Sequence, residues 1–528
     1  MTSATYEKKK KEDYNVELKT KSEFRRPSGK EVAACKPCRL CLVGTFLLFL
    51  IGLLVASIVL IAITDKCKTT ERVKKSNIFA YQVYVKSFQD SDNDGEGDVN
   101  GLKAKLSYIK NMGTKVIVLN DAVGKKDLKL DLNMGDIKGF KKLVSSSKEQ
   151  GMKVLIQMNP VVVADDNEWF IESKQKNSKH DWFIWRDANF TNNWKSVSSG
   201  SAWHGAGGYR NQSFYSHFGA SLPTLNYYSS EVVGEVTKIL NWWLDLGVDG
   251  FVLTSISRLV VDKKFRSNNG NCSYDKDLPY SHKILANLFQ TIHQRGGVVW
   301  VVPRTNVKES VKYFGNKDNQ EADVVLNDDF ALLKSSSLTA KRLNESLSTY
   351  LKDQPSFGEI GWMMGGTSYT RLASRFSSAQ SKLMSLFLLT LPHVVLNYYG
   401  DELLLQDTKD GKSFAMMKWS NDTKEASRAI TVAFSNLTHI RSSMDVFKYS
   451  PKIVYAKEKA LVMWYKGSTE LIVGANFGSA AAQAANVTEA VKGKFIFHTD
   501  DTKTGKKVDL KTPLEVPANQ LFLMEVIE

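Results

Sequence analysis

The sequence predicts an α/β protein made of a single transmembrane helix, a closed (β/α)8 TIM barrel and a C-terminal antiparallel β domain. One uncharged apolar segment lies near the N-terminus, eight short apolar runs alternate with helical patterns, and the pattern changes after about residue 410. These features divide the chain into an N-terminal tail (1–39), a membrane helix (40–64), a neck (65–76), a barrel (77–409, with an insert at about 163–228) and a β-sandwich domain (410–528).

The composition is that of an ordinary globular protein with a positive charge. Of the 528 residues, 43% are hydrophobic and 24% are charged, and the formal net charge is +15. The lysines and arginines are spread along the chain, and no nucleic-acid-binding motif is present. We therefore expect no nucleic-acid partner, and we interpret the charge as a solvated basic surface near the anionic headgroups of membrane lipid.

The apolar segment runs from Leu40 to Thr64 without a charged residue. As a helix, its 25 residues would extend roughly 37 Å, whereas the hydrocarbon core of a bilayer is about 30 Å thick. About 40 residues precede it, whereas the apolar region of a cleaved signal peptide is shorter and lies closer to the N-terminus. The segment therefore predicts a permanent signal-anchor that crosses the membrane once.

The flanking charges barely decide the orientation of this helix, since residues 20–39 carry six Lys/Arg and residues 65–84 carry five. All seven N-x-S/T sequons, however, follow the helix. They predict a cytosolic N-terminus and a glycosylated C-terminal part, with glycans at Asn189, Asn211, Asn271, Asn344, Asn421, Asn436 and Asn486.

Three of the five cysteines, Cys35, Cys38 and Cys41, lie at the predicted cytosolic edge of the membrane. The reducing cytosol disfavours disulfides there, so these residues are candidates for palmitoylation, with free thiols as the alternative.

Cys67 and Cys272 lie on the oxidising side of the membrane. The two could pair with each other. However, Cys67 is tethered to the bilayer by the neck, whereas Cys272 falls in a surface-loop pattern of the folded domain. This separation favours an intermolecular disulfide through Cys67, either to a second copy or to another chain.

Eight apolar runs after residue 77 predict the strands of a parallel barrel, because strands buried on both faces are almost continuously apolar. The runs are Ile78–Val85, Lys115–Asn120, Lys153–Met158, Val248–Thr254, Val298–Val302, Asp323–Asn327, Glu359–Met364 and His393–Tyr399. Helical patterns lie between most of them, for example Leu102–Met112, Ile137–Gln150, Val232–Leu246 and Ser378–Leu391. Near the C-terminus, ALVMWYKG, ELIVGANF, KFIFHT and QLFLMEVI predict antiparallel strands.

Several of these segments resemble the α-amylase and α-glucosidase superfamily. The resemblance rests on AYQVYVKSFQDSDNDGEGDVNGL, DWFIWRDANFTNNWKSVSSGSAWH, WWLDLGVDGFVLT and LPHVVLNYYGDE, and it extends from about residue 77 to the C-terminus. It implies an α-amylase-type barrel with an insert after the third strand and a C-terminal β domain.

The catalytic groups of that superfamily are missing from the matching positions. Glycoside hydrolysis uses two carboxyl groups, which barrel enzymes place at the C-terminal ends of strands. In the fourth-strand pattern GVDGFRxD, Val252 replaces the Arg and Thr254 replaces the nucleophilic Asp. Pro303 and Arg304 stand where the fifth strand should lead to the acid Glu, and Ser368 stands at the Asp of the NHD motif. The sequence therefore predicts a pseudoenzyme with no catalytic residue.

A loop after the first predicted strand carries alternating acidic residues with two glycines between them. The spacing matches the first half of a calcium loop, and similar loops in the resembled glycosidases bind Ca²⁺. The candidate ligands of a structural Ca²⁺ are Asp90, Asp92, Asp94, Glu96 and Asp98, and the alternative is a solvated acidic turn.

Taken together, the tail, the span, the neck cysteine and the glycosidase-like ectodomain resemble the heavy subunits of heteromeric amino acid transporters, the rBAT-like and four-F-two-antigen-type glycoproteins. The resemblance implies a plasma-membrane protein that is disulfide-linked through Cys67 to a polytopic light subunit, which carries the amino acids. A receptor or adhesion glycoprotein that forms a homodimer and a membrane-bound α-glucosidase-like hydrolase are the alternatives.

Overall fold

The computed structural model describes residues 36–63, 76–124, 126–175, 179–197, 200–208, 211–270, 272–419, 425–485 and 487–527. The chain separates into two compact units, Met1–Lys68 and Thr69–Glu528.

The first unit contains helix α2, Lys36–Ile63, which confirms the predicted apolar helix. Its 28 residues extend roughly 42 Å, and the window Leu40–Ser57 has a mean hydropathy of 2.6 with none of its residues buried in the protein. The hydroxyls of Thr45 and Ser57 donate to carbonyl oxygens one turn earlier in the helix. By length and composition, α2 is able to cross a membrane, and these two hydroxyls are satisfied within the helix.

The second unit is built on a closed barrel of eight parallel strands, as predicted. Each strand pairs in parallel with two neighbours, and β1 closes the ring by pairing with both β2 and β11. In order around the barrel the strands are β1 (Ile78–Tyr84), β2 (Val116–Asn120), β3 (Lys153–Met158), β7 (Gly250–Thr254), β8 (Val298–Val302), β9 (Val324–Asn327), β10 (Glu359–Met363) and β11 (Val394–Tyr398).

Alternate residues of each strand face two different apolar layers. Ala80, Leu155, Val252 and Trp300 belong to a cluster that fills the barrel interior, whereas Phe251 and Leu253 belong to the larger core shared with the helices. Both faces of every strand are thus buried, which explains why the strands read as continuous apolar runs in the sequence.

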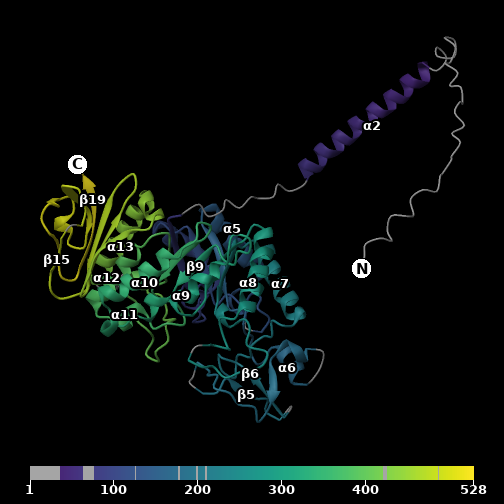
Figure 1. Ribbon diagram of the computed structural model, residues 1–528, viewed down its shortest axis with the longest axis horizontal. Helices are drawn as coiled ribbons and strands as arrows, with labels where there is room; N and C mark the ends of the chain where they lie inside the picture. The colour runs from purple at the N-terminus through teal and green to yellow at the C-terminus, as the bar shows by residue number, and fades with distance from the viewer. Residues whose placement is uncertain are drawn as a thin grey trace, which may run out of the picture. The chain divides into compact units, whose positions relative to one another are not determined.

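Helices cover the outside of the barrel, and Figure 1 shows α5, α7, α8 and α10 around the strands. The predicted helix over residues 102–112 is two short helices, because Lys105 leaves the helical conformation between them. The helices of this layer are α3 (Val99–Ala104), α4 (Leu106–Asn111), α5 (Ile137–Glu149), α7 (Ser230–Asp245), α8 (Pro279–Gln294), α9 (Val307–Ser310), α10 (Ala340–Lys352), α11 (Leu372–Arg375), α12 (Ser378–Leu388) and α13 (Glu425–Ser443).

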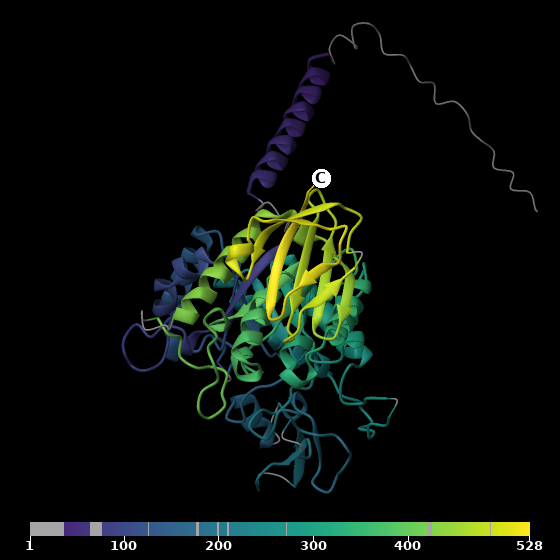
Figure 2. The same cartoon turned by 90° about the vertical axis from the view of Figure 1, so that its left-hand side faces the viewer.

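The insert after β3 projects from the barrel as a small subdomain (Figures 1 and 2). It contains α6 (Glu168–Lys174) and a three-stranded antiparallel sheet in the order β4-β6-β5, with bounds Trp185–Asp187, Gln212–Tyr215 and Trp203–Gly205. Trp194, Trp203 and Tyr215 pack together at its centre, so these aromatic side chains form the subdomain's own core.

The C-terminal strands form a six-stranded antiparallel sheet in the order β12-β13-β14-β19-β16-β17 and a two-stranded sheet, β15-β18, as Figure 2 shows in yellow. They begin at Lys452, after α13, which contacts β1 and α12 of the barrel. The bounds are β12 (Lys452–Lys457), β13 (Ala460–Tyr465), β14 (Leu471–Asn476), β15 (Ala482–Ala484), β16 (Lys492–His498), β17 (Lys507–Asp509), β18 (Leu514–Val516) and β19 (Gln520–Ile527).

A buried arginine of α13 joins this helix to the barrel. The guanidinium of Arg441, which is 1% exposed, donates to the carbonyl oxygens of Leu389, Leu391 and His393 between α12 and β11. Carbonyl groups that follow a helix need partners when they are buried, and here one side chain supplies three of them.

We predict that Arg441→Met lowers the free energy of unfolding by about 3 kcal/mol or more, because three buried carbonyls lose their donor. The matched control is Arg295→Met, which removes a solvent-exposed ion pair with Asp245 and should cost less than about 1 kcal/mol. Thermal unfolding of the purified variants measures the difference. Equal losses in the two variants would contradict the role given to Arg441.

Candidate functional site

A cavity of about 270 Å³ lies at the C-terminal ends of the barrel strands, where barrel proteins place their functional groups. Its walls come from the ends of β2, β3, β7, β8 and β10 and from the insert. The lining residues are Asn120, Asp121, Val123, Gly124, Leu128, Gln157, Met158, Asn159, Val162, Val163, Phe218, Leu222, Thr254, Ser255, Arg304, Thr367 and Ser368.

Three of the five positions predicted to be degenerate meet in this cavity. Thr254, Arg304 and Ser368 line it together, although they come from distant parts of the sequence. Val252 faces the apolar interior of the barrel and is fully buried, and Pro303 is buried at the end of β8. The structure thus brings two neutral hydroxyl side chains and one basic side chain together at the positions for which the sequence predicts lost catalytic acids.

Among the described residues that line the cavity, Asp121 is the sole acidic one and Arg304 the sole basic one. The Asp121 carboxylate accepts a hydrogen bond from Tyr84, and burial together with this carboxylate raises the pKa of Tyr84. Thr254 is 8% exposed, and its hydroxyl donates a long hydrogen bond of 3.4 Å to the carbonyl of Met158. Glycoside hydrolysis uses two carboxyl groups that flank the scissile bond, and the described lining of this cavity supplies one.

The backbone at the mouth of the barrel keeps a strained geometry. Asp121, Ser255 and Arg304 follow β2, β7 and β8, and their φ angles are 64°, 61° and 59°. Side chains other than glycine rarely adopt this left-handed conformation, and such strain concentrates at functional sites. The strained residues at these three strand ends therefore support the barrel mouth as the candidate functional site.

Arg304 interacts with Tyr369 and with the buried carboxyl group of Asp328. The guanidinium of Arg304 lies 5.4 Å from the ring centroid of Tyr369, whose hydroxyl donates to the Asp328 carboxylate at 2.5 Å. Burial raises the pKa of Asp328, against the lowering effects of the Tyr369 hydrogen bond and of Arg304. The Nε atom of Arg304 is buried and has no hydrogen-bond partner among the described residues.

Sequence reasoning did not single out Asp121 or Asp328. Each is a carboxyl residue that directly follows a predicted strand, and this position was the one available signal.

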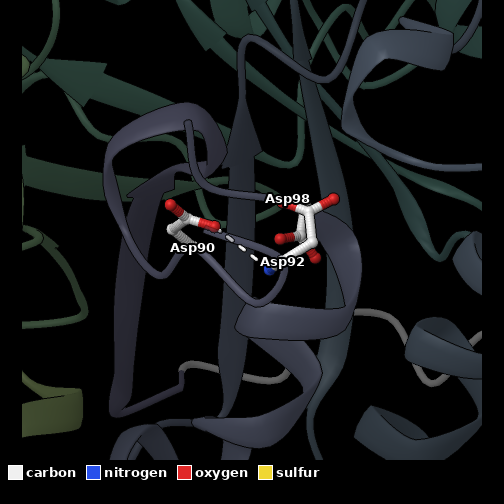
Figure 3. A group of neighbouring side chains, drawn as sticks. All are labelled: Asp90, Asp92 and Asp98. Carbon is white, nitrogen blue, oxygen red and sulfur yellow. Dashed lines mark hydrogen bonds between the residues drawn. The ribbon is translucent and has the colours of Figure 1, made fainter. Parts of the chain in front are cut away.

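The acidic loop after β1 brings some of the predicted calcium ligands together. Carboxylate oxygens of Asp90, Asp92 and Asp98 lie within 4.8 Å of one another (Figure 3). Asp94 and Glu96 do not belong to this group. The Asp94 carboxylate instead accepts a hydrogen bond from a backbone N–H of the loop, and that of Glu96 lies 3.9 Å from the Lys86 ammonium.

Backbone N–H groups already hold two of these carboxylates. Asp90 accepts from the N–H groups of three loop residues, and that of Gly95 is the main cause that lowers the pKa of Asp90. Asp98 caps α3 by accepting from Asn100 and Gly101. Partial burial opposes ionisation of Asp98, but these N–H groups and that of Ser91 lower its pKa overall. The all-oxygen donor set fits a hard cation such as Ca²⁺.

The remaining predicted sites are dispersed. Cys41 is exposed on α2, and Cys272 is exposed and has a free thiol. Among the sequons, Asn189, Asn211 and Asn436 are exposed, whereas Asn344 is half-buried on α10 and accepts a hydrogen bond from Ser348. The sites that lie outside the described residues are Cys35, Cys67, Asn271, Asn421 and Asn486, and for Cys38 only the backbone is described.

Comparison with known proteins agrees with this barrel fold. The family model "Alpha amylase, catalytic domain" matches residues 82–450, and the chain therefore belongs to the alpha-amylase family. Among solved structures, the trehalose-6-phosphate hydrolase of Bacillus licheniformis is similar over 86% of this chain and 100% of its own, with a TM-score of 0.74 and 17% identity. The isomaltulose synthase SmuA of Protaminobacter rubrum covers 86% of this chain and 99% of its own, with a TM-score of 0.76 and 18% identity.

Curated relatives include both transporter subunits and hydrolases. The amino acid transporter heavy chain SLC3A1 of Homo sapiens is 28% identical over 456 residues, which are 76% of this chain and 65% of the relative. The alpha-glucosidase of Apis mellifera is also 28% identical, over 63% of this chain and 64% of its own. The chain thus spans about two thirds of the length of these relatives, and identity alone does not separate the two kinds of protein.

We predict that Ser255→Gly raises the free energy of unfolding by about 0.5–1 kcal/mol, since glycine adopts this left-handed conformation without strain. Ser257→Gly, two residues further along the chain, is the matched control and should lower it by about 1 kcal/mol. Thermal or denaturant unfolding measures both values. A loss of stability in Ser255→Gly as large as that in the control would show that the mouth of the barrel stores no strain here.

Proposed function

We propose that the protein is a non-catalytic type II membrane glycoprotein that acts as the heavy subunit of a heteromeric amino acid transporter. It anchors to the plasma membrane through α2, forms a disulfide through Cys67 with a polytopic light subunit, and supports the surface expression and stability of that subunit. The observation that carries the proposal is the composition of the barrel mouth, where Thr254, Arg304 and Ser368 line the cavity and Asp121 is the one carboxyl residue in its described lining.

The chemistry of the mouth supports a binding or scaffolding role better than hydrolysis. Formation of a glycosyl-enzyme requires a carboxylate nucleophile, and departure of the leaving group requires a second carboxyl group as its acid. The neutral hydroxyl of Thr254 does not stabilise an oxocarbenium-like centre as a carboxylate does, and the cationic Arg304 would oppose one.

The apolar helix supports the rest of the proposal. A single helix without a charged residue in its central window has no polar pathway of its own, so the transported amino acids must cross through another chain. Such a helix is able to pack on the helices of a partner, and a disulfide next to the membrane would prevent dissociation. The similarity to SLC3A1, whose printed name is that of an amino acid transporter heavy chain, agrees with this function.

The second candidate function is α-glucosidase-like hydrolysis. The observation in its favour is the equal identity to the alpha-glucosidase of Apis mellifera. Release of glucose from maltose by the purified protein, at a rate that Asp121→Asn abolishes, would establish it and overturn the heavy-subunit proposal. We expect no release above that of a heat-denatured sample.

We predict that Cys67→Ser leaves the protein folded but makes the partner chain separable in SDS without reductant. Cys272→Ser is the matched control, because it removes the other thiol on the same side of the membrane and should leave the complex intact. Non-reducing gels of native membranes, followed by peptide identification of the co-migrating chain, provide the measurement.

Each pattern on these gels has a distinct meaning. A smaller hydrophobic chain that is lost only in Cys67→Ser supports the heavy-subunit proposal. A product of doubled mass that contains this chain alone would instead support a receptor or adhesion homodimer, and an unchanged complex in Cys67→Ser would refute the assignment of the bridge.

We further propose that Asp90, Asp92 and Asp98 hold a structural Ca²⁺, which would supply positive charge to a loop with several nearby carboxylates. We predict that Ca²⁺ raises the Tm of the purified protein by about 2–5 °C, since a ligand that binds only the folded state stabilises it. Asp92→Asn should abolish this increase. Asp94→Asn, which changes a carboxylate outside the group, should preserve it. An increase that survives Asp92→Asn would place the ion elsewhere.

A further inference from the structure

The described lining of the cavity at the barrel mouth pairs one carboxylate with one guanidinium, whereas glycoside cleavage needs two carboxyl groups. We propose that the cavity binds, without cleaving it, a single polyhydroxylated ring that carries one oxyanion, a carboxylate or a phosphate, with the oxyanion on Arg304. This inference goes beyond the heavy-subunit function and does not depend on it, because it concerns a ligand site within the barrel of this chain.

Arg304 has the position and the charge to bind an anion. It lines the cavity at the end of β8, where its side chain also forms a hydrogen bond with that of Tyr369, and its buried Nε has no hydrogen-bond partner among the described residues. Its left-handed backbone and its packing on the Tyr369 ring fix the direction of the guanidinium before a ligand binds. A guanidinium held in this way presents two parallel donors, which match the geometry of a carboxylate or a phosphate.

The acidic groups near Arg304 leave the centre of the cavity open to an anion. Asp328 interacts electrostatically with Arg304, but it lies behind Tyr369 and does not line the cavity. Asp121 does line the cavity, but its carboxylate interacts with the hydroxyl of Tyr84 and with the charge of Lys86. Neither carboxylate therefore supplies the partner that the Arg304 Nε lacks.

The rest of the lining suits the hydroxyl groups and the apolar face of a ring. Amide and hydroxyl groups line part of the cavity, from Asn120, Gln157, Asn159 and Ser368. Apolar surface comes from Phe218 and Leu222 of the insert. The cavity volume of about 270 Å³ is slightly below the range of roughly 300–1,000 Å³ that holds drug-sized ligands. A single ring fits this volume better than an oligosaccharide.

The test is binding to the purified full chain in detergent micelles, measured by isothermal titration calorimetry and by saturation-transfer NMR. The probes are D-glucuronate, D-glucose 6-phosphate and D-glucose. We expect at least one of the anionic sugars to bind about tenfold or more tightly than glucose, because a charge-assisted hydrogen bond contributes at least that factor. The comparison of glucuronate with glucose 6-phosphate distinguishes a carboxylate ligand from a phosphate ligand.

Two variants locate the site. Arg304→Gln should reduce the affinity for the anionic sugar to that for glucose. Ser368→Asp adds a negative charge at an exposed position of the rim and should weaken anion binding without disturbing the core, so it tests the proposal even if Arg304→Gln fails to fold. The matched control is Arg295→Gln, an exposed arginine on the surface, which should bind like the wild type.

Each of three outcomes would overturn the proposal. Glucose could bind as tightly as the anionic sugars, no probe could bind at concentrations of about 1 mM, or both variants could bind the anionic sugar as well as the wild type does. The non-reducing gels of native membranes are run on the same variants. If the disulfide-linked complex is present but no anionic sugar binds, this inference alone is refuted. If an anionic sugar binds but wild-type membranes contain no such complex, only the heavy-subunit proposal is refuted.

Discussion

Closure of the parallel barrel is the constraint on which the rest of the structure depends. Because β1 pairs with both β2 and β11, no strand edge is left free, and both faces of every strand are covered by apolar side chains. Polar side chains can therefore gather where the strands end, and the parallel arrangement brings all the C-terminal ends to one rim. Stability is supplied by the layers inside and outside the barrel, whereas chemistry is confined to the rim.

This separation explains how the rim of such a barrel can change its chemistry while the fold stays intact. Thr254 and Arg304 line the cavity without belonging to the apolar layers, and Val252 lies within the interior layer. The left-handed residues Asp121, Ser255 and Arg304 lie just beyond β2, β7 and β8, where the chain leaves the barrel. A rim of this kind favours recognition over bond cleavage, and the same substitutions underlie both the heavy-subunit proposal and the anion site.

The chain is equally identical to a transporter heavy chain and to an alpha-glucosidase, so the side chains of the site have to separate the two functions. The cavity offers one carboxylate and one guanidinium where a retaining mechanism needs two carboxyl groups about 5–5.5 Å apart. The apolar helix adds a second, independent consideration, because its uncharged window suits a contact with lipid or with another helix. Both observations favour a protein that accompanies another membrane chain.

The amino-acid sequence by itself determined the apolar helix, the eight barrel strands and the antiparallel C-terminal strands, because burial on one or both faces imposes a short-range apolar pattern. It also led to the prediction that the catalytic acids are missing, since a resembled motif shows a difference residue by residue. Only the tertiary structure decided which polar groups meet. Asp90, Asp92 and Asp98 approach one another while Asp94 and Glu96 do not, because the loop bends around its own N–H groups. The contact of Arg304 with Tyr369, and of Tyr369 with Asp328, likewise depends on neighbouring strand ends that lie far apart in the sequence, and no local pattern encodes such a distance.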